Sequence, residues 1–155
     1  PTIRSRCISF AVAPVSPEDC ARYCTAQGVG AKDAALYSAL FDGHIGTVLA
    51  AARDEARREQ VDRALALAKA AAARDSYAAA VLLAAYEKDK AGASALLADF
   101  RAVAAAGLRD SPHSPVEGET ARKALGAADV AMQQIGAQVN PKIVLSVLAA
   151  QFRTF

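Results

Sequence analysis

Alanine is the residue that most limits what this chain can fold into. It occurs in uninterrupted runs, such as residues 70–73 and 78–80, while glycine and aromatic residues are sparse. Because alanine is the strongest helix former, this composition predicts helices. The hydrophobic share of 54% is ample for a buried core in a chain of 155 residues. We therefore expect an all-α protein.

Basic and acidic side chains are nearly balanced and are mixed along the chain. The 18 lysine and arginine residues and the 16 aspartate and glutamate residues give a formal net charge of +2. A strong electrostatic field for nucleic acid is therefore not expected. Charged residues interrupt the apolar stretches well before the roughly 20 residues that span a bilayer, and no signal core follows a cationic start. We expect a soluble, cytoplasmic protein without membrane contact.

The three cysteines are Cys7, Cys20 and Cys24, an odd number in a chain without secretory features. Reduced thiols are expected rather than a disulfide framework. Cys20 and Cys24 would share a helix face and could ligate zinc together with Cys7 or His44, but they lack the C-x-x-C turn of structural zinc knuckles. No metal is predicted. Because the chain begins at Pro1 without methionine, we interpret it as a fragment of a longer protein.

The N-terminal third combines one strand signal with helix signals. Residues 7–12 are β-like and are closed by a proline. Ser16 and Pro17 have the types expected of a capping residue and a first helical position, which predicts a helix that ends near Gly28. A second helix is predicted over residues 31–41.

A third helical pattern begins at Ile45 and continues through the charged stretch 53–60 towards Ala73. The alternating signs in this stretch predict a solvated helix with internal ion pairs. Whether this connection is straight or kinked near Asp54 is left open by the pattern. Further helices are predicted over residues 76–88, 91–108, 119–138 and 141–152, with a loop at 110–115 and with Asn140 capping the last helix.

The chain opens with Pro-Thr-Ile-Arg-Ser-Arg-Cys, which holds the arginines Arg4 and Arg6. A guanidinium is planar and permanently charged, so it can donate to two oxygens of a γ-phosphate and offset the charge that develops in phosphoryl transfer. Taken alone, the three residues Ser5-Arg6-Cys7 are also compatible with a surface arginine in a turn. Arg4 is either a second phosphate contact or a solvated partner for an acid.

The triplet Ser5-Arg6-Cys7, the residues before it and the helix start at residues 14–18 resemble, in order, the clamp-loader subunits of bacterial DNA polymerase III, which are AAA+ proteins. The resemblance implies that Arg6 is a trans-acting arginine finger. Ser5 and Cys7 complete its motif, and the role of Cys7 is implied to be structural.

Residues 42–49 occupy the place of the family's sensor-2 helix. ATP-binding members usually read Gly-Ser-x-Arg-Asp-Ala there, and the arginine contacts the subunit's own nucleotide. Gly46 stands at the corresponding position and has no side chain to offer a phosphate. This departure makes the chain most similar to delta-prime-type subunits. The neighbouring His44 is predicted to lie beside a helix cap, not to act as a base or ligand.

Residues 138–148 are similar to the Asn-Pro-x-Leu-x-Leu-Glu-x-Leu-Leu pattern that closes the family's collar domain, with Ser146 in place of the usual acid. The resemblance implies three parts. Residues 1–13 would be a strand remnant of the AAA+ nucleotide-binding-type core, residues 14–54 a three-helix lid, and residues 55–155 a helical collar for oligomerisation.

The implied function is that of a non-ATPase clamp-loader subunit. It would bind no cofactor itself and would act on ATP held by a neighbouring subunit, so the fragment alone is not catalytic, although it belongs to a polymerase holoenzyme. Its partners would be the gamma/tau and delta subunits, the sliding clamp and, through the assembled complex, primed DNA. Two alternatives stay open: a gamma/tau-type ATPase with a diverged sensor, and a helical scaffold module with no nucleotide role.

Overall fold

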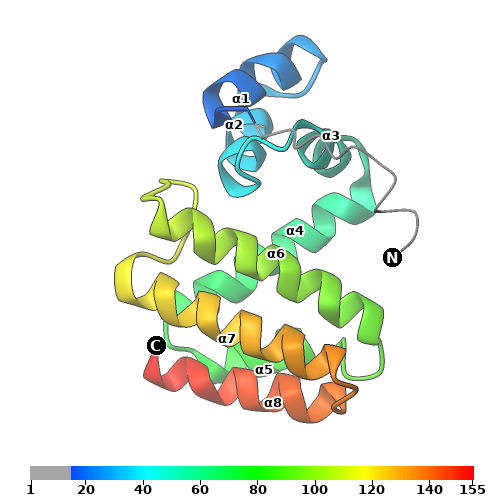
Figure 1. Cartoon of the computed structure of the whole chain (residues 1–155), viewed down its shortest axis with the longest axis vertical. Helices are drawn as coiled ribbons and strands as arrows, with labels where there is room; N and C mark the ends of the chain where they lie inside the picture. The colour runs from blue at the N-terminus through cyan, green and yellow to red at the C-terminus, as the bar shows by residue number, and fades with distance from the viewer. Residues whose placement is uncertain (1–14) are drawn as a thin grey trace, which may run out of the picture.

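In the computed structural model, residues 15–155 are described, and all the regular structure among them is helical (Figure 1). The all-α prediction is therefore confirmed for this part of the chain. The strand predicted at residues 7–12 and the motif residues Ser5, Arg6 and Cys7 lie outside the described residues.

Three short helices, α1 (Pro17–Ala26), α2 (Ala31–Leu40) and α3 (Ile45–Arg53), pack together into what we call the N-terminal unit. The predicted cap of α1 is confirmed, because the Ser16 hydroxyl accepts a hydrogen bond from the Asp19 amide at 3.1 Å. Gly43 separates α2 from α3 with a positive φ of 73°, and its Cα lies close to the Val15 carbonyl. Only glycine tolerates both the positive φ and the close approach of another backbone carbonyl.

The long third helix predicted from Ile45 towards Ala73 is divided in the structure. Helix α3 ends at Arg53, and α4 (Glu55–Ala72) begins after Asp54, whose backbone is extended. The Asp54 carboxylate accepts hydrogen bonds from the amides of Ala56 and Arg57 at 3.0 and 3.4 Å. An aspartate that caps a new helix competes with continuation of the old one, which accounts for the break.

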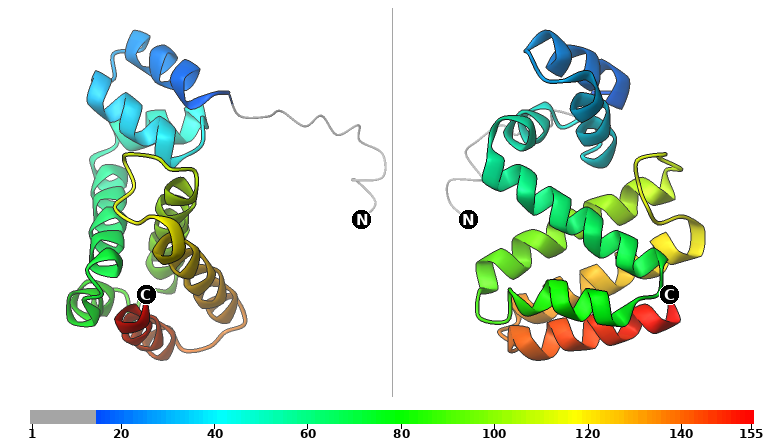
Figure 2. Two further views of the ribbon diagram at one scale, coloured as in Figure 1. Left: turned by 90° about the vertical axis from the view of Figure 1, so that its left-hand side faces the viewer. Right: turned by 180° about the vertical axis from the view of Figure 1, so that it is seen from behind.

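Helix α4 leads into the C-terminal bundle, which also contains α5 (Ser76–Ala84), α6 (Lys90–Leu108), α7 (Gly118–Gly136), α8 (Pro141–Gln151) and the short 3-10 helix η2 (Phe152–Thr154). Figure 1 shows the N-terminal unit at one end of the molecule and α5 and α8 at the other; Figure 2 shows α4 joining the two ends. Helix α6 packs against both α4 and α7, and α8 packs against both α5 and α7.

The bundle follows the predicted helices closely, with one difference in length. Helix α5 ends at Ala84 instead of residue 88, and the chain turns before Asp89 caps α6 by accepting a hydrogen bond from the Gly92 amide at 2.9 Å. The predicted cap of α8 is confirmed, because the Asn140 side chain accepts from the Lys142 amide at 3.0 Å.

Helix α6 is the one helix among residues 15–155 that is long and apolar enough to cross a membrane. Half of that stretch is buried inside the bundle, as in the core helix of a soluble protein. Its buried Phe100 stacks on Phe152, and Phe152 in turn contacts Phe155, so the last residues of the chain close the core. The fold is compatible with the predicted soluble protein.

Candidate functional site at the junction of the two helical parts

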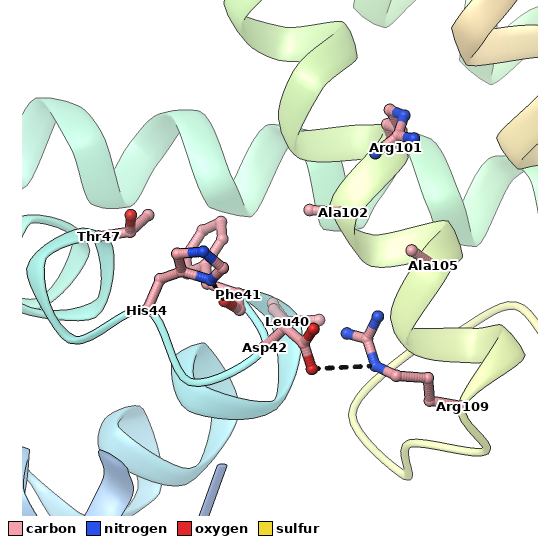
Figure 3. A pocket seen from close by; sticks show the side chains of 9 residues that line it. All are labelled: Leu40, Phe41, Asp42, His44, Thr47, Arg101, Ala102, Ala105 and Arg109. Atoms are coloured by element: carbon pink, nitrogen blue, oxygen red, sulfur yellow. Dashed lines mark hydrogen bonds and ion pairs between the residues drawn. The ribbon is translucent and has the colours of Figure 1, made fainter. Parts of the chain in front are cut away.

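A cavity of about 300 Å³ lies where the N-terminal unit meets the C-terminal bundle (Figure 3). One wall comes from the end of α2 and the start of α3, and the other comes from α6. The lining residues are Leu40, Phe41, Asp42, His44, Thr47, Arg101, Ala102, Ala105 and Arg109. The cavity therefore combines an apolar floor with two guanidinium groups and an imidazole.

The start of α3 forms one edge of this cavity. His44 is the N-cap residue, and its Nδ1 atom lies 2.7 Å from the Phe41 carbonyl oxygen, so the ring donates a hydrogen bond there. His44 was predicted to lie beside a helix cap, and in the structure it is the N-cap residue itself. Gly46 is in the first turn, and a Cβ atom built on it would meet no other atom within 4 Å. Gly46 is thus exposed, between His44 and Thr47, which line the cavity.

Both guanidinium groups of the cavity already have partners. Arg109 donates to the Ala39 carbonyl at 3.2 Å and lies 3.6 Å from the Asp42 carboxylate, so it links α6 to the end of α2 (Figure 3). Arg101 donates to Asp129 of α7 at 2.6 Å. Each of these arginines therefore lies beside a carboxylate that partly balances its charge.

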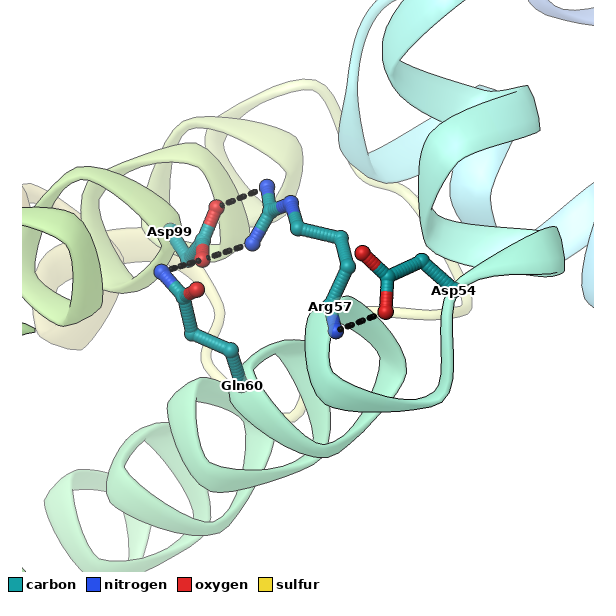
Figure 4. Close-up of polar contacts among 4 residues, drawn as sticks. All are labelled: Asp54, Arg57, Gln60 and Asp99. Atoms are coloured by element: carbon teal, nitrogen blue, oxygen red, sulfur yellow. Dashed lines mark hydrogen bonds and ion pairs between the residues drawn. The ribbon is translucent and has the colours of Figure 1, made fainter.

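A second and more buried contact joins α4 to α6 (Figure 4). Arg57 forms a two-pronged ion pair with Asp99, with one N···O distance of 2.6 Å, and Gln60 donates to the same carboxylate at 2.9 Å. The side chains of Arg57 and Asp99 are 22% and 7% exposed. The hydrogen bonds to Asp99 raise the pKa of Arg57, although desolvation opposes the rise.

Arg57 also contacts the N-terminal unit. Its guanidinium carbon lies 5.4 Å from the centroid of the Phe41 ring, within range of a cation–π interaction. One side chain therefore touches α6 and the end of α2 at the same time. Together with Arg109, it is one of the side chains that connect the bundle to the N-terminal unit.

These contacts correct the prediction for the charged stretch 53–60. Its arginines do not pair mainly within their own helix: Arg53 donates to the Gln27 carbonyl at 3.1 Å, and Arg58 donates to the Ala52 carbonyl at 2.9 Å. The pair between Glu59 and Arg63 is of the expected internal kind. Helical spacing shows which charges share a face, but it does not show which charged side chains another element brings opposite that face.

The sequence analysis did not identify Asp99 as part of this network, although its position in the sequence indicates a buried charge. It is an acid within the apolar pattern of α6, on the face that also carries Leu96 and Phe100. A charged group on the buried face of a helix needs a partner, because an unpaired charge there is costly. The expectation of a cationic partner follows, although the sequence alone does not identify Arg57.

Cys20 and Cys24 lie one turn apart on the buried face of α1. Cys20 and Cys24 have no exposed surface, and burial, with Cys20 close by, raises the pKa of the Cys24 thiol. In the part of the chain that the structure describes, no cluster of three or more histidine, cysteine, aspartate or glutamate side chains is placed to hold a metal ion. The cysteines act here as small apolar core residues.

The apolar residues of the last helix divide into two sets. Val144 and Leu148 are buried against the bundle, whereas Ile143 and Val147 are exposed on its surface. Ser146 is also exposed. The helix thus has one face for the core and another, still apolar, for solvent.

No protein-family model, no curated protein and no solved structure matches this chain at a significant level.

Proposed function

We propose that the chain is the C-terminal part of a non-ATPase, delta-prime-type subunit of a bacterial clamp loader. The observation that carries the proposal is the Ser5-Arg6-Cys7 triplet. In this proposal Arg6 reaches the γ-phosphate of ATP bound by an adjacent gamma or tau subunit, where a permanently charged planar group stabilises the transition state. The chain itself holds no nucleotide.

The order of elements after the motif supports the proposal. A three-helix unit follows the triplet, and a larger helical bundle follows that unit, which is the order expected for a lid and a collar. The N-terminal unit is then the lid, and the C-terminal bundle is the collar through which loader subunits join into a ring. The extended residue Asp54 between α3 and α4 supports a boundary between lid and collar at residues 54 and 55.

Gly46 supports the non-ATPase assignment. An ATP-binding relative would need a cationic side chain in the first turn of α3, and this chain has a glycine with open space around it. The nearest arginines across the cavity, Arg101 and Arg109, are engaged with Asp129 and with Asp42. Both guanidinium groups therefore lie beside carboxylates of this chain, which supports the assignment.

In the assembled loader the partners would be the gamma/tau and delta subunits, with the sliding clamp and primed DNA as the objects of the reaction. ATP on the neighbouring subunit is the cofactor on which Arg6 acts. Hydrolysis is then possible only where two subunits meet, so it is coupled to a correctly assembled ring on DNA. The protein would act in the cytoplasm.

The test is Arg6→Ala in the full-length subunit, reconstituted with its loader partners. ATP turnover stimulated by clamp and primed DNA should fall by about 10³-fold, the scale of arginine fingers in related phosphoryl-transfer enzymes. The matched control is Arg4→Ala, two residues away, which should reduce turnover far less if Arg4 is a solvated side chain. Loader assembly, followed by analytical gel filtration, should be unchanged in both. Wild-type turnover from the Arg6→Ala loader would refute the finger.

Direct nucleotide binding separates the alternatives. A delta-prime-type subunit should show no ATP binding in isothermal titration calorimetry, whereas a gamma/tau-type subunit should bind it. A helical scaffold with no nucleotide role would bind no ATP and would also leave loader turnover unaffected by Arg6→Ala.

A further inference from the structure

The cavity between the N-terminal unit and α6 has the composition of a small-molecule site (Figure 3). Its volume of about 300 Å³ is at the lower end of the range for ligand pockets in proteins. The buried Leu40 and Phe41 form its apolar floor, and exposed polar side chains from both walls surround that floor. A pocket of this kind suits a small molecule with an apolar body and one charged group.

The wall from α6 has small side chains between two arginines. Arg101, Ala105 and Arg109 follow one another at intervals of four residues and therefore share one face of the helix. Ala102 and Ala105 are half-buried and have only a methyl group each, so α6 leaves space opposite the apolar floor. The cavity exists because alanine stands where a larger side chain would fill it.

Arg101 has hydrogen-bond donors left for a ligand. A guanidinium has five N–H groups. In Arg101, Nε donates to Asp129 at 2.6 Å, and neither terminal nitrogen forms a hydrogen bond with the described part of the chain. Arg109 has fewer donors left, because a terminal nitrogen donates to the Ala39 carbonyl at 3.2 Å and Nε lies 3.6 Å from Asp42. The two terminal nitrogens of one guanidinium can donate to both oxygens of a carboxylate at once.

The opposite wall, at the start of α3, offers no cation for a carboxylate. The Nδ1 atom of His44 donates to the Phe41 carbonyl at 2.7 Å, so Nε2 of the neutral ring has no proton and accepts hydrogen bonds only. The Thr47 hydroxyl lines the same wall and is uncharged. A carboxylate is therefore expected on the α6 side of the cavity.

We propose that this cavity binds a small organic acid, with a compact apolar body on Leu40 and Phe41 and a carboxylate held by the two terminal nitrogens of Arg101. The ligand would contact the end of α2 and the middle of α6 together, so it would strengthen the contact between the N-terminal unit and the bundle. Binding requires neither a nucleotide nor a partner subunit. The inference is therefore independent of the proposed function.

The first experiment compares cinnamate with cinnamyl alcohol, which has the same apolar body without the charge. Each is titrated into the isotope-labelled chain of 155 residues, and amide chemical shifts are followed by NMR. Cinnamate should shift the amides of His44, Thr47, Ala102 and Ala105, and it should bind about 10-fold more tightly than the alcohol, because charge-assisted hydrogen bonds are stronger. Unshifted amides at these positions would refute the cavity as the site. Equal affinities for the two compounds would refute the carboxylate contact.

Filling the cavity tests its location. Ala105→Leu should abolish cinnamate binding, because the larger side chain would occupy the space. The matched control is Ala95→Leu, the same change at a half-buried alanine of α6 that does not line the cavity, and it should bind cinnamate as the wild type does. Circular dichroism melting should show that both variants are folded. Unchanged affinity in a folded Ala105→Leu variant would overturn the assigned location.

Arg101→Gln tests the carboxylate contact at an exposed side chain, where the change should affect stability little. It is therefore informative even if Ala105→Leu does not fold. The affinity for cinnamate should fall about 10-fold, while that for cinnamyl alcohol should stay the same. The control is Arg122→Gln on α7, an exposed arginine paired with Glu119 outside the cavity, which should change neither affinity. Wild-type affinity of Arg101→Gln for cinnamate would refute the role of Arg101.

Discussion

The N-terminal unit and the C-terminal bundle are both helical, but they are stabilised in different ways. Three helices of the bundle, α4, α6 and α7, have 18, 19 and 19 residues, and alanine makes up much of their buried faces, as in Ala121, Ala124 and Ala128 of α7. The N-terminal unit has helices of 10, 10 and 9 residues and relies on a few larger side chains, such as the fully buried Tyr37. Because short helices contribute little stability by themselves, single buried residues should contribute more to the stability of the N-terminal unit.

The junction between the two regions differs from both. Two arginines contribute to it: Arg57 of the bundle lies over the Phe41 ring, and Arg109 lies beside the exposed Asp42. Ion pairs depend on geometry and on burial more than apolar contacts do. We therefore expect the bundle to tolerate isolated surface substitutions. The N-terminal unit and its contacts with the bundle should depend on a few specific residues.

The largest effect should come from Gly43→Ala in the N-terminal unit. A Cβ atom there would lie 1.8 Å from the Val15 carbonyl oxygen, and φ is positive at 73°. Backbone strain and the clash together should cost about 4 kcal/mol, measured by urea denaturation. The control is Gly46→Ala, three residues away in open space, which should be neutral or slightly stabilising. Equal stability of the two variants would show that the N-terminal unit does not depend on a glycine at residue 43.

Asp99→Ala should have the next largest effect, because it leaves the guanidinium of Arg57 half-buried and unpaired. The expected loss is about 3 kcal/mol, the lower end for a broken buried pair, since Arg57 keeps some solvent contact. Asp129→Ala is the matched control: it breaks the pair with Arg101, whose side chains are 48% and 51% exposed, and should cost about 0.5 kcal/mol. The double variant Arg57→Met with Asp99→Leu should recover most of the loss. A loss no greater than that of the control would show that the pair is not structurally important.

The smallest effect on global stability should come from Arg109→Ala, about 0.5 kcal/mol for a partly exposed contact. Its local effect should be clearer. The amides of Gly43 and His44, which donate to the Ser38 and Phe41 carbonyls at 3.0 and 3.1 Å, should exchange hydrogen faster, while amides of α7 should not. Unchanged exchange at both positions would mean that Arg109 does not hold the end of α2 against the bundle.

Much of the fold could be predicted because its signals are local. The capping side chains of Ser16 and Asn140 act on amides two or three residues away, and both are where the sequence predicts them. The early end of α5 and the break at Asp54 were less predictable. At each place an aspartate can continue one helix or cap the next, and the neighbouring packing decides between them.

The candidate site was less predictable than the fold. Gly46 and His44 could be placed at the start of α3 from the sequence, since both lie within one turn of the predicted helix start. The cavity beside them could not be predicted, because its other wall comes from α6, more than fifty residues further along the chain. Arg6 remains a prediction based on its motif.

By itself, the sequence determined the helical class, most of the helix limits and the presence of apolar faces, because these depend on intrinsic propensity and on spacing within one segment. Only the tertiary structure decided that Arg57 pairs with Asp99, that Arg109 reaches the end of α2, and that Ile143 and Val147 face solvent rather than the core. Those outcomes depend on which helices lie side by side, and long-range packing is not encoded in the period of any single helix.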